Sequence, residues 1–242
     1  MCIRDRVWGA FLVMGCLNNV IPFSLMAWGQ LSIETGLTAI LNAATAIWGV
    51  IVAAMIFPSE RLTTSRAIGV LLGFLGVATA IGLKSFASFD LRSLAQIAVI
   101  AGTVSYAFAS SWARAMLSDH PPLVAAAGML TGSALVMLPL AFVVEGPLPM
   151  DLSPRTWGAI AYYAIAATAI AYVLYYRILA AAGAGNLMLV TLMIPPIAIL
   201  LGTWVRGEVL SQNAYLGFAL LALGLVILDG RAGHVVRKRL TQ

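Results

Sequence analysis

The polar side chains inside the long apolar stretches of this chain are uncharged, and the chemistry open to them is hydrogen bonding. Eight stretches contain no Asp, Glu, Lys, Arg or His: 7–33, 35–57, 67–83, 93–113, 121–144, 156–176, 178–205 and 209–228. A proton relay needs acidic residues or histidines, and none lies near the centre of a stretch. Amides, hydroxyls and aromatic rings suit a small neutral or zwitterionic solute better than a strongly charged one.

Ten of these uncharged residues are candidates for binding a solute. They carry amide, hydroxyl or aromatic groups inside the apolar stretches: Asn18, Asn19, Trp28, Gln30, Asn42, Thr45, Tyr106, Tyr163, Tyr172 and Thr191. On a helix, Asn42 and Thr45 share one face, as do Thr168 and Tyr172. A hydrogen bond between helices is the simpler interpretation for any single residue. The group as a whole predicts the lining of a cavity.

Patterns for covalent or metal chemistry are missing from the sequence. The two cysteines, Cys2 and Cys16, have neither metal-ligand nor disulfide spacing. The two histidines, His120 and His234, lie in different loops without a partner. We therefore expect no metal, no cofactor and no catalytic site.

The stretches that hold the candidates have the length of membrane-spanning helices. About 17–25 apolar residues are needed to cross the ~30 Å hydrocarbon core of a bilayer. Apolar residues make up 62% of the 242 and charged residues 10%, whereas a soluble domain carries roughly 25% charged residues. In a soluble protein, the solvent-exposed face of a helix would also carry a charged residue every turn or two. The composition therefore indicates an integral membrane protein.

Turn residues between the stretches predict an all-α polytopic bundle of eight transmembrane helices. Pro58, the pair Pro121 and Pro122, and the glycines Gly183 and Gly185 stand between successive stretches. Helices pair their backbone amides internally, as the lipid core requires. The expected ranges are 7–30, 35–57, 65–83, 93–116, 121–144, 156–180, 185–205 and 212–229.

Lysine and arginine positions predict the orientation. With an even number of spans both termini lie on one side, which collects Arg61, Arg66, Arg114, Arg177, Arg231, Arg237, Lys238 and Arg239. The other side collects fewer cations: Lys84, Arg92, Arg155 and Arg206. Because Lys and Arg are enriched in cytoplasmic loops, we expect both termini in the cytoplasm, as in a bacterial inner membrane protein. Residues 232–242 then form a basic cytoplasmic tail, with the lipid bilayer rather than nucleic acid as partner.

The sequence repeats itself at a shift of about 148 residues. This shift superimposes Glu60 on Glu208, Leu62 on Leu210, Gly69 on Gly217 and Gly76 on Gly224. The motif Trp-Gly-Ala at 8–10 likewise returns at 157–159. The shift contains five predicted helices, and an odd number inverts the second copy, as in many secondary transporters. The first copy then holds only the last three of five helices, so the sequence predicts a 3+5 arrangement that lacks two helices at the front.

Five short segments carry a resemblance to a known family. They are 18–24, 36–43, 60–63, 69–77 and 207–210. Their order and the repeat are similar to the EamA-type family of the drug/metabolite transporter superfamily, which is built from two five-helix repeats. The resemblance implies an incomplete first repeat over 7–83 and a complete second repeat over 93–231. It also implies an exporter or permease of small metabolites, amino-acid-like or otherwise neutral or zwitterionic, that works by alternating access.

Some features depart from the family pattern and leave alternatives open. Ala46 stands where the family often has proline, at the position that matches Pro195. The family's first two helices are absent, and residues 1–6 differ in character, which we interpret as a possible gene-fragment scar. One alternative is therefore a non-transporting membrane scaffold or fragment. An integral-membrane enzyme is a less favoured one.

Prolines, glutamates and glycines have expected mechanical roles. Proline inside a helix removes a backbone hydrogen bond, so Pro22, Pro195 and Pro196 are predicted kinks or hinges. Glu60 and Glu208 lie at the ends of spans, which favours a salt bridge or a helix-end role over proton transport. Close helix packing, with a homodimer as one possible use, is predicted for Gly69, Gly73, Gly76, Gly217 and Gly224.

Overall fold

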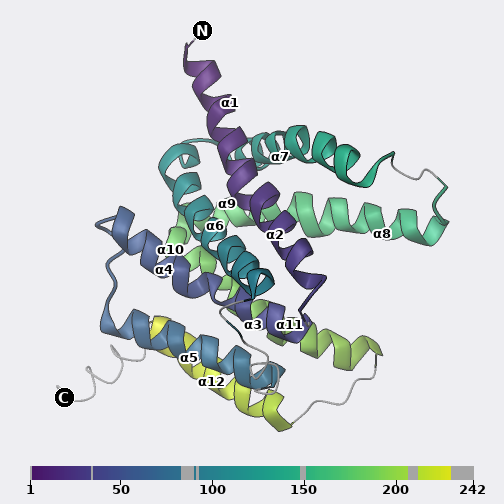
Figure 1. The fold of residues 1–242 in the computed structure, drawn as a ribbon. Coiled ribbons are helices and arrows are strands. Elements are labelled where there is room, and N and C mark those ends of the chain that lie inside the picture. Colours follow the sequence, from purple (N-terminus) through teal and green to yellow (C-terminus); the bar gives the residue numbers. More distant parts are fainter. Residues whose placement is uncertain are drawn as a thin grey trace.

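The computed structural model describes residues 2–33, 35–82, 90, 93–147, 151–206 and 212–229. Every regular element in this part of the chain is a helix, which agrees with the predicted all-α class. The helices form a bundle in which segments far apart in the sequence lie side by side (Figure 1).

The described residues of the first half form three helical segments. α1 (Cys2–Gly15), the π-helical segment η1 (Cys16–Val20) and α2 (Ile21–Gln30) follow one another without a break. α3 (Thr35–Ala43) and α4 (Thr45–Ile56) are separated by a single turn residue, and α5 (Thr64–Ile81) ends the half. α1 includes residues 2–6, for which we expect no structural role from the sequence.

The described residues of the second half begin with two long helices, α6 (Leu94–Leu117) and α7 (Pro122–Glu145). α8 (Pro154–Ala164), the π-helical segment η3 (Ile165–Ile170) and α9 (Ala171–Ala182) again run on continuously. The last elements are α10 (Ala184–Met188), α11 (Val190–Arg206) and α12 (Gln212–Asp229).

Six helical segments among the described residues are long and apolar enough to cross a membrane, judged by length and composition. They are Val7–Gln30, Leu37–Ile56, Thr64–Ile81, Leu94–Leu117, Pro122–Glu145 and Pro154–Ala182. Their ranges agree with the first six predicted spans to within a few residues. Ala184–Ile197 and Gln212–Leu228 are shorter apolar helices at the places predicted for the last two spans. The count of eight therefore stays a prediction.

Short polar residues and a glycine set the helix ends. The Thr63 hydroxyl accepts a hydrogen bond from the Arg66 amide at 3.2 Å before α5. The Ser153 hydroxyl does the same for the Thr156 amide, also at 3.2 Å, before α8. Such caps satisfy an amide that the first helical turn leaves unpaired. Gly183 has φ of +84° and lets the chain turn from α9 directly into α10.

The bounds of the elements recur at the shift predicted from the sequence. Moving α5 by 148 residues gives the bounds of α12. Moving η1 by 149 residues gives 165–169, which lies within η3. α3 and α10 also begin 149 residues apart. The inverted relation of the two copies stays a prediction.

α5 and α12 lie side by side (Figure 1), with small residues where they meet. A Cβ atom on Gly76 would lie 2.6 Å from the backbone nitrogen of Leu221, a distance that real Cβ atoms do not show. The Cβ position of Gly73 faces the Leu192 side chain at 2.8 Å, and its backbone nitrogen lies 2.7 Å from the Cβ position of Gly224. The predicted glycines between α5 and α12 are Gly69, Gly73, Gly76, Gly217 and Gly224. This glycine surface is occupied within the chain, and a homodimer stays a prediction.

We expect Gly76→Ala to lower the thermal midpoint of the purified protein by roughly 5 °C. Overpacking costs about 1–3 kcal/mol, and each kcal/mol shifts the midpoint of a protein of this size by about 2–4 °C. Gly158→Ala is the matched control, because nothing lies within 4 Å of a Cβ atom there. Equal midpoints for the two variants in thermal unfolding would contradict close packing of α5 on α12.

Candidate functional site: an uncharged cavity

A cavity of about 420 Å³ lies where η1, α3, α4, α6, α9, α10 and α11 meet. Its polar lining residues are Asn18, Asn42, Thr45, Tyr106, Tyr172, Tyr175 and Thr191. The other described lining residues are apolar, and none of the described lining residues is charged. A mainly apolar cavity with a few convergent polar groups is typical of a site for a small molecule.

One wall of the cavity is a closed network of hydrogen bonds. The side-chain amide of Asn18 donates to the Tyr172 hydroxyl and to the side-chain oxygen (Oδ1) of Asn19, each at 3.0 Å. The Tyr172 hydroxyl donates to the Asn19 carbonyl oxygen at 2.6 Å. Behind the wall, the Asn19 amide donates to the Ser133 hydroxyl of α7 at 2.7 Å. The network ties α9 and α7 to η1 and fixes the direction of the two asparagines.

The local sequence explains why both asparagines sit on a widened helical turn. Pro22 is buried in the first turn of α2 and has no N–H group. The backbone carbonyl of Asn18 therefore lacks the backbone N–H donor that an α-helix would supply four residues later. This suits the π-helical geometry of η1, a geometry that is frequent at functional sites. η3 contains no proline, but its Thr168 hydroxyl donates to the Tyr163 carbonyl, five residues back, at 2.9 Å.

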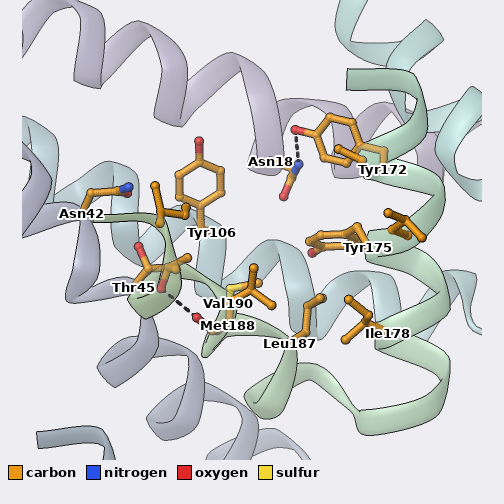
Figure 2. Close-up of a pocket in the computed structure, with 14 residues that line it drawn as sticks. Asn18, Asn42, Thr45, Tyr106, Tyr172, Tyr175, Ile178, Leu187, Met188 and Val190 are labelled. Atoms are coloured by element: carbon orange, nitrogen blue, oxygen red, sulfur yellow. Dashed lines mark hydrogen bonds between the residues drawn. The ribbon is translucent and has the colours of Figure 1, made fainter. Parts of the chain in front are cut away.

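Other polar atoms of the residues that line the cavity have no hydrogen-bond partners. The Asn42 carbonyl oxygen and the Thr45 hydroxyl are buried and make no hydrogen bond to any described residue. The Tyr175 hydroxyl is also buried and makes no hydrogen bond to any described residue. Figure 2 shows Asn42, Thr45 and Tyr106 on one side of the cavity and Tyr172 and Tyr175 on the other. Buried polar atoms normally find a partner, so these three atoms have hydrogen-bonding capacity that no described residue uses.

The structure brings most of the predicted binding residues to this cavity. Those that line it are Asn18, Asn42, Thr45, Tyr106, Tyr172 and Thr191. Asn19 lies behind the wall. Trp28 and Gln30 are exposed near the end of α2, and Tyr163 lines a separate groove. Pro195 and Pro196 are buried within α11. The roles of all these residues stay predictions.

Sequence analysis missed Ser133, which anchors the network from α7. Its hydroxyl lies in an apolar span beside Gly132, and this small, polar pair is the signal that marks a close helix contact. A Cβ atom on Gly132 would come within 2.9 Å of the Phe11 carbonyl oxygen. The apolar lining from α10 was also missed, because Leu187 and Met188 look like ordinary membrane residues.

A second polar cluster lies at one end of the bundle, around the buried side chain of Glu60. Its carboxylate accepts hydrogen bonds from the backbone amides of Ala184 at 2.9 Å and Gly185 at 2.8 Å. It also forms ion pairs with Arg114 and, at 3.8 Å, with Arg66. A negative charge is favourable at the first amides of a helix. Glu60 thus joins the loop before α5 to the start of α10.

This geometry matches the salt-bridge and helix-end role expected for Glu60. The partners are on α5 and α6, and the neighbouring Arg61 is exposed. The Arg114 guanidinium also lies 4.4 Å from the centre of the Phe57 ring, a cation–π arrangement. Glu208, the counterpart of Glu60, lies outside the described residues.

Comparisons with known proteins agree with this architecture. The chain is 27% identical over 228 residues to the uncharacterized transporter YwfM of Bacillus subtilis (strain 168), covering 94% of this chain and 75% of that protein. It is 28% identical over 214 residues to an uncharacterized transporter of Archaeoglobus fulgidus, covering 87% and 71%. One solved crystal structure matches 95% of this chain and 88% of its own chain with a TM-score of 0.74 at 16% identity, so it shares the fold.

The model of the EamA-like transporter family matches residues 3–82 and 93–228. These ranges contain the cavity, the Glu60 cluster and all six apolar helices of membrane length. The chain is therefore an integral membrane protein that belongs to the EamA-like transporter family.

Proposed function

We propose that this protein transports a small neutral or zwitterionic metabolite, which binds in the 420 Å³ cavity. The observation that carries the proposal is the set of unpartnered buried atoms, led by the Asn42 carbonyl oxygen and the Thr45 hydroxyl. A solute that donates hydrogen bonds would satisfy both atoms, while its apolar part would pack on the tyrosine rings. Charged solutes are disfavoured, because no described lining residue offers an opposite charge.

Alternating access between the two repeats is the mechanism that we propose. The recurring bounds of α5 and α12 support two equivalent units. Pro22 in α2 and Pro195 in α11 are the proposed hinges, since each removes a backbone hydrogen bond close to the cavity. We place both termini and the Glu60 cluster on the cytoplasmic side of a bacterial inner membrane. The surplus of Lys and Arg supports this orientation.

Flux assays in proteoliposomes test the proposal. We expect uptake of neutral or zwitterionic metabolites to persist without a pH gradient, because the described cavity lining has no acid or histidine to carry a proton. The screen should compare each solute with an analogue that carries a net charge. Flux that depends strictly on a pH gradient would contradict uncoupled transport or exchange. No flux of any small solute would instead favour a membrane scaffold.

We expect Tyr172→Phe to raise the solute KM by roughly fivefold while the protein still inserts and folds. The change removes a hydroxyl that bonds both Asn18 and Asn19, and a neutral hydrogen bond contributes about 1 kcal/mol. Tyr162→Phe is the matched control, because this tyrosine is exposed and lies outside the cavity. If both variants show the wild-type KM in proteoliposomes, the hydrogen-bonded wall does not shape the binding site.

A further inference from the structure

A second cavity, of about 620 Å³, lies around the buried side chain of Glu60 and has no part in the proposed transport cycle. Among the described residues, none lines both this cavity and the uncharged one. The polar residues that line this Glu60 cavity are Ser59, Glu60, Arg66, Arg114, Ser118 and Asn186. Charged groups from α5, from α6 and from the loop before α5 therefore meet at one opening.

The charged residues of the Glu60 cavity leave one positive charge without compensation. Arg66 and Arg114 both pair with Glu60, so two cations share one carboxylate. The other described lining residues are uncharged, and the neighbouring Arg61 and Asp119 are exposed, opposite in charge and outside the lining. The Arg66 and Arg114 side chains are only 18% and 28% exposed. Because a charge withdrawn from water needs a counter-charge, this balance favours a bound monoanion.

The two arginines have N–H donors that their described contacts leave unused. Besides its ion pair, the Arg114 guanidinium donates to the Ser59 hydroxyl at 3.1 Å. The Arg66 guanidinium donates to the side-chain oxygen of Asn186 at 2.8 Å and to a backbone carbonyl of the loop before α5 at 3.4 Å. A guanidinium carries more N–H donors than these contacts occupy. Its planar fork matches the oxygen atoms of a carboxylate or a phosphate.

The position of the Glu60 cavity favours a phosphate over a carboxylate. Leu179 and Leu228 line its apolar side from the last turns of α9 and α12, which end at Ala182 and Asp229. The apolar helices of a membrane protein end where the hydrocarbon core meets the polar headgroups, and the phosphates of phospholipids lie at this level. Basic pockets between membrane helices bind such headgroups.

We propose that the Glu60 cavity binds one phosphate group with a single negative charge, held by Arg66 and Arg114. The phosphodiester of phosphatidylglycerol has this charge, and a soluble phosphodiester offers the same chemistry. A phosphomonoester, with a charge between about −1.5 and −2 at pH 7, exceeds the positive surplus and is repelled by the Glu60 carboxylate. The inference does not depend on the identity of the transported solute.

Thermal unfolding of the delipidated protein in a neutral detergent tests this proposal. The midpoint is measured with phosphatidylglycerol, with zwitterionic phosphatidylcholine and with the soluble diester glycerophosphoglycerol. Native mass spectrometry counts the lipids that stay bound. Arg66→Gln removes the surplus charge and keeps the pair of Glu60 with Arg114, whereas Arg66→Lys keeps the charge. The matched control is Arg177→Gln, which removes an exposed cation of α9 outside the cavity.

We expect phosphatidylglycerol to raise the midpoint by about 5 °C, with one lipid bound, because a ligand of the folded state stabilises it. Arg177→Gln should respond like the wild type, Arg66→Lys should retain part of the shift, and Arg66→Gln should bind the lipid at least about tenfold more weakly. A shift with the lipid alone would assign the phosphate to the bilayer. An equal shift with glycerophosphoglycerol would assign it to a soluble compound.

Three results would overturn the proposal. The first is an absent shift with both the lipid and the soluble diester. The second is an equal shift with phosphatidylcholine, which would show that apolar contact alone stabilises the protein. The third is a shift in Arg66→Gln as large as in the wild type, which would place the bound lipid elsewhere.

Discussion

Glu60→Ala is expected to destabilise the protein strongly, because the Glu60 side chain is buried. The change leaves the amides of Ala184 and Gly185 without acceptors and leaves Arg114 without its carboxylate. Removing one partner of a buried ion pair costs about 3–5 kcal/mol, and because Arg114 is partly exposed we expect the lower end, about 3 kcal/mol. At about 2–4 °C per kcal/mol, the thermal midpoint should fall by roughly 6–12 °C.

Two comparisons make this prediction specific. Glu145→Ala removes an exposed carboxylate at the end of α7 and should leave the midpoint unchanged. The double variant Glu60→Ala with Arg114→Ala should lose less stability than the two single losses added together, because it does not leave the Arg114 cation without its carboxylate. Equal midpoints for Glu60→Ala and Glu145→Ala would show that the contact between the loop before α5 and α10 contributes little.

Asn42→Leu is expected to reduce solute flux by more than tenfold without destabilising the protein. The Asn42 carbonyl oxygen is buried and unpartnered, so an apolar side chain of similar size removes a desolvation cost. The solute loses a hydrogen bond inside the cavity, and about 1.4 kcal/mol corresponds to a tenfold change in binding. Lost flux with an unchanged or raised thermal midpoint is the signature of a binding residue.

The isosteric change Thr45→Val should behave in the same way, because the Thr45 hydroxyl is also buried without a partner. Thr131→Val is the control, since this exposed hydroxyl bonds the Ala127 carbonyl of its own helix. A structural role for Asn42 would instead give parallel losses of stability and flux. That outcome in proteoliposome assays and thermal unfolding would remove Asn42 from the binding site.

Helix positions were predictable because every span must cross the lipid core without charged residues and with its backbone groups paired internally. The absence of charge from 94–113 or 122–144 indicates a spanning helix whatever its neighbours are. The repeat at 148–149 residues was also visible, and the bounds of α12 follow from those of α5. The break at Ala44 was not predictable, because neither glycine nor proline stands there.

The binding site was predictable in composition but not in geometry. Asn42 and Tyr172 were expected at a cavity because polar groups avoid lipid, and they line one. Helical spacing alone places Tyr163 and Tyr172, which are about two and a half turns apart, on opposite faces of the span, and the two residues line different cavities. Helical spacing could not show that Glu60 contacts Ala184, because these residues lie 124 positions apart in the sequence.

The central claim, that the transported solute occupies the uncharged cavity, is tested most directly by blocking the cavity. A single cysteine at Thr191→Cys, in a background without Cys2 and Cys16, places a reactive group in the lining. Flux is measured in proteoliposomes before and after reaction with a bulky maleimide, with and without the transported solute present during labelling. We predict that labelling abolishes flux and that the solute, near its KM, protects the cysteine. Full flux through a completely labelled protein would contradict the account.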